Sequence, residues 1–128
     1  MNMDSNAKPA HFGFLRSFSY AFAGIATALR GERNMRFHFF SSIVVILISF
    51  YFSITKTEWL FILVAIGGMF ALEIVNTAIE RVVDLVTGEY HPLAKQAKDL
   101  AAGAVFVYAV LSFVIGIVIF IPYILELF

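Results

Sequence analysis

WLFILVAIGGMFALEIVNTAIERVVDLV (residues 59–86) is the stretch that decides the fold, because its two halves differ in chemistry. The first half is apolar enough for the interior of a bilayer, and the second half keeps helical spacing while it becomes acidic. At about 100° per residue, six polar residues of this stretch and of the position that follows it lie within an arc of about 100°: Glu73, Asn76, Thr77, Glu80, Asp84 and Thr87. An ionisable group as deep as Glu73 costs on the order of a few kcal/mol. The stretch therefore predicts a membrane helix whose polar side faces a protein interior or a hydrated cavity.

The composition of the whole chain supports a membrane protein. Its 128 residues are 61% hydrophobic and 16% aromatic, with a mean hydropathy of +0.89. A soluble domain of this size could not bury so much apolar surface. Because there is no cysteine, a disulfide framework and a thiolate metal site are excluded. The net charge is zero and no basic run occurs, which argues against a nucleic-acid partner. We expect one all-α membrane domain over residues 1–128.

Three segments are long and apolar enough to cross a hydrocarbon core of about 30 Å: residues 37–54, 59–86 and 97–125. The preceding segment, residues 12–30, carries a polar stripe that includes Arg16 and Tyr20, opposite a stripe of phenylalanines. This pattern predicts an amphipathic helix in the membrane interface, with a plain anchor as the alternative. We expect a bend or break at Gly31 and a loop over residues 87–95.

The distribution of basic residues predicts the orientation of the chain. Five of them precede the first span: Lys8, Arg16, Arg30, Arg33 and Arg36. Three more, Arg81, Lys95 and Lys98, lie between the start of the acidic segment and the apolar part of the third span, whereas the turn between the first two spans has only Lys56. The positive-inside rule then places the N-terminus and the loop at 87–95 in the cytoplasm and the C-terminus outside.

The acidic half of the second span and the residues after it indicate a cation site. Carboxylates outnumber bases in this region, and Glu32 adds another at the same level. Magnesium binds one or two carboxylates and completes its shell with water and phosphate oxygens. Lys98 would supply a point charge for phosphate, and the deep carboxylate of Glu73 suits general-base work on a hydroxyl. These features favour phosphoryl transfer to a membrane alcohol. The alternative from the same residues is a structural role in which the acids pair with bases between helices.

ALEIVNTAIERVVDLVTGEYHPLAKQAKDLAAGAV (residues 71–105) resembles the signature region of the prokaryotic diacylglycerol kinase and undecaprenol kinase family. The shared pattern is E-x-x-N-x-A-I-E-x-x-V-D followed by H-x-x-x-x-x-A-K-D, and the resemblance extends over essentially the whole chain. It implies a lipid kinase of a bacterial cell membrane that uses ATP and Mg²⁺. It also implies a homotrimer with active sites shared between neighbouring subunits.

The resemblance assigns roles to individual residues. It makes Glu73 the general base for the lipid hydroxyl, and it makes Glu32 and Glu80 the carboxylates that hold the magnesium of the nucleotide. The implied nucleotide-binding residues are Arg16, Tyr20, Glu32, Asn76, Glu80, Lys98 and Asp99. Asp84 and His91 are implied to be supporting residues. His11 and His38 match no position of the pattern, and we expect both to be structural.

The acceptor lipid is predicted from a shorter stretch. ERNMRFH (residues 32–38) resembles the undecaprenol kinase branch, which implies conversion of undecaprenol to undecaprenyl phosphate. A diacylglycerol kinase that produces phosphatidic acid is the alternative within the family. A small oligomeric cation or proton channel is the alternative of another class, because Glu73 lies within a membrane span. Against the channel, WLFILVAIGGMFAL (residues 59–72) has no polar residue to continue an ion path.

Overall fold

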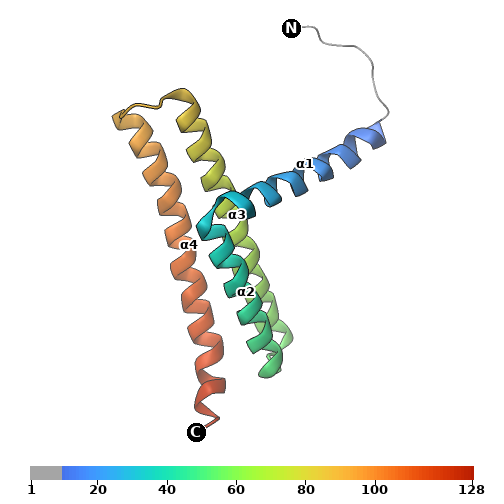
Figure 1. The fold of residues 1–128 in the computed structure, drawn as a ribbon. Coiled ribbons are helices and arrows are strands. Elements are labelled where there is room, and N and C mark those ends of the chain that lie inside the picture. The colour runs from blue at the N-terminus through green and yellow to red at the C-terminus, as the bar shows by residue number, and fades with distance from the viewer. Residues whose placement is uncertain (1–9) are drawn as a thin grey trace.

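The computed structural model describes residues 10–128, which form four helices and no strand (Figure 1). The helices are α1 (Ala10–Gly31), α2 (Arg33–Tyr51), α3 (Lys56–Val86) and α4 (Pro92–Leu125). The all-α prediction is confirmed. Lys8 and the rest of the polar segment 1–9 lie outside the described residues.

Three of these helices, α2, α3 and α4, are long and apolar enough to cross a membrane. The prediction of three helices that could span a membrane is therefore confirmed. In the bundle, α3 packs against both α2 and α4, and α3 and α4 run antiparallel beside each other (Figure 1). The helix α1 leaves the bundle sideways and contacts it only near the α1–α2 junction (Figure 1). The placement of α1 in a membrane interface stays a prediction.

The break between α1 and α2 lies at Glu32, one residue after the predicted position. Gly31 is still helical, whereas Glu32 is extended, with φ −111° and ψ 121°. Arg36 stabilises this corner, because its Nη1 donates to the carbonyl oxygens of Leu29 at 3.3 Å and Arg30 at 2.9 Å. These carbonyls lie in the last turn of α1 and have no partner within that helix. This corner therefore restricts the position of the Glu32 side chain.

The turn between α2 and α3 is held by a reciprocal capping box. Thr55 Oγ1 accepts from the Glu58 N–H at 3.2 Å, and the Glu58 carboxylate accepts from the Thr55 N–H at 2.8 Å. The Tyr123 hydroxyl at the end of α4 donates to the same carboxylate at 2.7 Å. Below this network lies a cluster of buried residues, Ile54, Ile62 and Ile119. We call this group the closed end of the bundle.

The crossing of α3 and α4 depends on a small residue. The Tyr108 hydroxyl of α4 donates to the Val64 carbonyl oxygen of α3 at 2.7 Å. A Cβ atom at Gly68 would overlap that tyrosine ring, whereas a Cβ atom at Gly67 would meet nothing within 4 Å. Gly68 therefore allows the close approach of the two helices, a role that small residues commonly take in membrane helix packing.

The start of α4 corrects the predicted boundaries. The helix expected over residues 97–125 begins at Pro92, so the loop expected over 87–95 ends at His91. Local chemistry explains the difference: His91 is the N-cap, its Nδ1 accepts from the Leu93 N–H at 3.1 Å, and Pro92 takes the first helical position. The consequence is that Lys95, Lys98 and Asp99 all lie on helical turns.

Candidate functional site

Glu73 is the most enclosed acidic group among the residues whose burial the structure describes. Its side chain lies in the middle part of α3, and the residue is only 4% exposed. Among the residues whose burial the structure describes, it is the sole charged residue in the buried interior. The Nε2 atom of His38, on α2, lies 3.4 Å from its Oε1 atom. Glu73 therefore sits between two spans, as its depth in the sequence predicted.

The sequence did not predict the contact between His38 and Glu73, and His38 was expected to be structural. A usable signal exists in the sequence: His38 and Glu73 are ionisable groups inside two separate apolar segments. Such groups in a membrane span generally face the bundle and find one another. The spacing within either segment cannot show which residues meet, because the contact depends on how α2 packs on α3.

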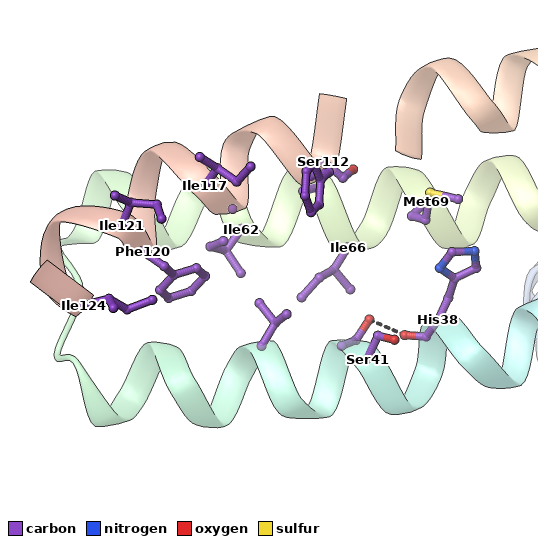
Figure 2. A pocket seen from close by; sticks show the side chains of 15 residues that line it. His38, Ser41, Ile62, Ile66, Met69, Ser112, Ile117, Phe120, Ile121 and Ile124 are labelled. Atoms are coloured by element: carbon purple, nitrogen blue, oxygen red, sulfur yellow. Dashed lines mark hydrogen bonds between the residues drawn. The ribbon is translucent and has the colours of Figure 1, made fainter. Parts of the chain in front are cut away.

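An apolar groove extends from His38 between α2, α3 and α4 (Figure 2). It encloses about 380 Å³. His38 and Met69 lie at one end, and Phe120, Ile121 and Ile124 lie at the other (Figure 2). Most of the remaining lining residues are aliphatic. Since Glu73 contacts His38 and follows Met69 by one helical turn, its carboxylate lies near the polar end of a groove that suits a hydrocarbon chain.

Asn76 and Glu80 continue the polar stripe of α3 beyond Glu73. Residues spaced three, four and seven apart lie on one side of a helix, so these three side chains share a side of α3. The Oδ1 atom of Asn76 is buried and has no hydrogen-bond partner among the described residues. A buried acceptor without a partner is costly in a native protein unless a ligand or solvent satisfies it. Glu80 is half-buried and forms no ion pair in the described part of the chain.

Three other carboxylates of the region, Glu32, Asp84 and Asp99, form ion pairs, whereas Glu89 forms none in the described part of the chain. Glu32 Oε1 lies 3.7 Å from Arg81 Nη2. Asp84 Oδ1 accepts from Lys98 Nζ at 2.6 Å and so joins α3 to α4. Part-exposed pairs of this kind contribute little to stability. A structural role, in which acids pair with bases between helices, therefore accounts for these acids. It does not account for the buried or unpaired polar groups of Glu73, Asn76 and Glu80.

Lys98 and Asp99 are neighbours in sequence but do not point to a common partner. Lys98 reaches across to Asp84 of α3, whereas Asp99 pairs with Lys95 one turn earlier on α4. Helical geometry separates consecutive side chains by about 100°, which explains the divergence. Both residues nevertheless line a second cavity of about 290 Å³ at the α3–α4 turn, together with Asp84, His91 and Lys95.

Arg16 and Tyr20 are not brought to the other predicted site residues within one chain. Both side chains are exposed on α1, and Tyr20 is 71% exposed. The N-terminal part of α1, which carries both residues, points away from the bundle formed by α2, α3 and α4 (Figure 1).

The oxygen donors present fit a magnesium ion that arrives with a nucleotide. Within residues 10–128, no group of three or more His, Cys, Asp or Glu side chains is placed to hold a metal by itself. Magnesium needs no such cage, since one or two carboxylates suffice when substrate phosphates complete its shell. Glu32 Oε1 lies 3.7 Å from Nη2 of Arg81, the residue that follows Glu80 on α3.

Comparison with known proteins gives a consistent result. Residues 19–120 match the family described as prokaryotic diacylglycerol kinase. The undecaprenol kinase of Bacillus subtilis is 50% identical over 109 residues, which are 85% of this chain and 89% of the relative. The diacylglycerol kinase of Synechocystis sp. is 39% identical over 114 residues, 88% of this chain and 65% of the relative. The diacylglycerol kinase of Pseudomonas aeruginosa is 34% identical over 93 residues, 73% of this chain and 76% of the relative. The chain therefore belongs to the prokaryotic diacylglycerol kinase family, and the predicted enzyme class, a lipid kinase, is confirmed.

Proposed function

We propose that the protein transfers the γ-phosphoryl group of ATP to the hydroxyl of undecaprenol and produces undecaprenyl phosphate. The observation that carries this proposal is the buried carboxylate of Glu73 near the polar end of an apolar groove between membrane spans. The 50% identity to a protein named undecaprenol kinase supports this choice of acceptor.

In the proposed reaction, Glu73 accepts the proton of the lipid hydroxyl while the hydroxyl oxygen forms a bond to the γ-phosphorus. The bond from that phosphorus to the bridging oxygen of ADP breaks, and ADP leaves. The apolar groove holds the hydrocarbon chain and positions the hydroxyl near Glu73. Because its lining is mostly aliphatic, the groove also limits the access of water that would otherwise compete as an acceptor.

The nucleotide binds on the side of Glu80 and Lys98. Magnesium bound with the nucleotide would neutralise charge on the phosphate oxygens, and Glu32 and Glu80 would hold it. Lys98 contacts phosphate, and Asp84 orients Lys98 through their ion pair. Asn76 offers its unpartnered oxygen to the bound complex. Asp99 and His91 line the second cavity, and His91 also caps α4.

The functional unit is a homotrimer with shared sites. In one chain Arg16 and Tyr20 lie on the part of α1 that points away from the bundle, so they would complete the nucleotide site of a neighbouring subunit. The N-terminus and the α3–α4 turn face the cytoplasm, where ATP is available, and the C-terminus lies outside. The helix α1 lies in the membrane interface, with the phenylalanine stripe towards the lipid.

The acceptor is tested with radiolabelled ATP and the purified protein in mixed micelles. Undecaprenol and diacylglycerol are supplied side by side at equal mole fraction. The expected result is that kcat/KM for undecaprenol exceeds that for diacylglycerol. The reverse preference would replace the acceptor with diacylglycerol, whereas transfer to neither lipid would overturn the proposed function.

The role of Glu73 is tested by Glu73→Gln. We expect this variant to lose lipid-dependent ATP turnover by about 100-fold or more, because the amide cannot accept the hydroxyl proton. Binding of a non-hydrolysable ATP analogue, followed by calorimetry, should stay close to the wild-type value. Turnover at the wild-type rate would remove Glu73 as the base.

A further inference from the structure

We propose that His38 is the positioning residue of Glu73 and holds its carboxylate in the orientation that accepts the hydroxyl proton. The inference rests on the proposed function, because it assigns a role within that same site. It goes beyond the family resemblance, in which His38 matched no position of the pattern.

The first support is the enclosure of both partners. The side chain of Glu73 is 5% exposed and that of His38 is 21% exposed, and their nearest polar atoms are 3.4 Å apart. No other base lies within ion-pair distance of Glu73 in the part of the chain that the structure describes. Among the described residues, His38 is therefore the one basic side chain placed to orient this carboxylate.

The second support is the position of the imidazole ring. His38 lines the apolar groove at the same end as Met69 (Figure 2). It also contacts Glu73, with its Nε2 atom 3.4 Å from Oε1. One side chain thus touches both the space proposed for the lipid and the group proposed as its base. The backbone of His38 is fixed as well, since its carbonyl oxygen accepts from the Ser42 hydroxyl at 2.7 Å.

The third support is the length of the contact. At 3.4 Å it is longer than an ordinary N–H···O hydrogen bond, which is about 2.7–3.2 Å. Contacts to catalytic groups are often long without substrate and tighten when the reactive complex forms. In the tightened complex, the Nε2–H of His38 would donate to Oε1, restrict rotation of the carboxylate and leave the other oxygen for the hydroxyl proton. The proton stays on Glu73 in this step, and His38 neither gains nor loses one.

Three substitutions of His38 test this role in the radiolabelled ATP assay. In His38→Gln the amide nitrogen can occupy the place of Nε2, whereas in His38→Asn it falls near the place of Nδ1. We expect His38→Ala and His38→Asn to lower kcat by about 100-fold, as misplacement by about 1 Å does, with KM for ATP unchanged. His38→Gln should recover most of the loss. Val44→Ala, on an exposed part of α2, is the matched control and should keep the wild-type kcat.

The kinetic outcomes separate the inference from the proposed function. If the wild type phosphorylates lipid and His38→Ala keeps its kcat, the role of His38 is overturned and the lipid kinase reaction stands. A loss that His38→Gln and His38→Asn share equally, together with lowered thermal stability, would also overturn it in favour of a structural role. A wild type that phosphorylates no lipid would overturn the proposed function itself.

A second measurement tests the contact without using activity. The chain has three histidines, so ¹⁵N ring labelling gives few signals, and His38→Gln identifies the one that belongs to His38. We expect Glu73→Gln to shift the His38 ring signals and to leave those of His11 and His91 in place. Unchanged His38 signals would overturn the inference.

Discussion

Glu73 and Glu80 lie two turns apart on the same side of α3, yet their surroundings differ. Glu73 is buried beside His38, whereas Glu80 is half-buried, close to the residues of the α3–α4 turn. A buried carboxylate suits an exchange with a lipid hydroxyl, and a more accessible one suits a hydrated cation. The two acids are therefore expected to respond differently when each is neutralised.

Glu80→Gln tests the magnesium side of the site. An amide lacks the negative charge of the carboxylate, so we expect the magnesium concentration for half-maximal activity to rise by on the order of tenfold. The measurement is a magnesium titration of lipid phosphorylation at fixed ATP. Glu126→Gln, at the C-cap of α4, is the control and should titrate as the wild type. An identical titration for Glu80→Gln would contradict its role as a metal ligand.

The sequence predicted the depth of Glu73, because depth follows from its place in a continuous apolar helix. It did not predict the partner of each charge. Lys98 was expected to act with Asp99, but it reaches Asp84, fourteen residues earlier on another helix. Which residues meet between helices depends on the rotation of each helix about its axis, and no spacing within one segment determines that.

At the level of helices, the close packing of α3 on α4 can be tested by substituting two adjacent glycines, Gly67 and Gly68. Gly68→Ala would drive a methyl group into the Tyr108 ring, so we expect it to lower the free energy of unfolding by about 1–3 kcal/mol, as overpacking does. Gly67→Ala adds the same methyl group where nothing lies within 4 Å, and it should leave stability unchanged or slightly raised. Denaturant unfolding in detergent micelles measures both. Equal stability of the two variants would contradict the close contact.

The boundaries of helices were predicted less well than their existence. The apolar length of α4 was clear from the sequence, but its first turns are polar and were assigned to a loop. His91 and Pro92 were the available signals, since a side-chain acceptor followed by proline is typical of a helix start. Because the residues that follow Pro92 are polar, hydropathy alone predicts a loop at this position.

In a single chain, most of the apolar surface of the membrane spans is exposed, so lipid or other subunits must cover it. Only 6% of the α4 span and 11% of the α2 span are buried within the chain. Lipid covers part of this surface, and the proposed trimer covers more. We expect light scattering of the protein in detergent, corrected for bound detergent, to give three times the 14.3 kDa chain mass. A particle of one chain mass that retains full lipid kinase activity would contradict the trimer.

The closed end described above has a consequence for how the molecule opens. The Thr55–Glu58 capping box, the Tyr123 hydroxyl and the isoleucine cluster lie together at that end, whereas the α3–α4 turn carries exposed, weakly stabilising pairs. Local unfolding begins where buried contacts are few. We expect amide hydrogens near residues 59–66 to exchange with deuterium far more slowly than those near residues 80–95, and binding of ATP with magnesium should slow the second group alone. Uniform exchange along α3 would contradict this. We therefore expect the substrates to enter at the α3–α4 end of the bundle, where local unfolding costs least.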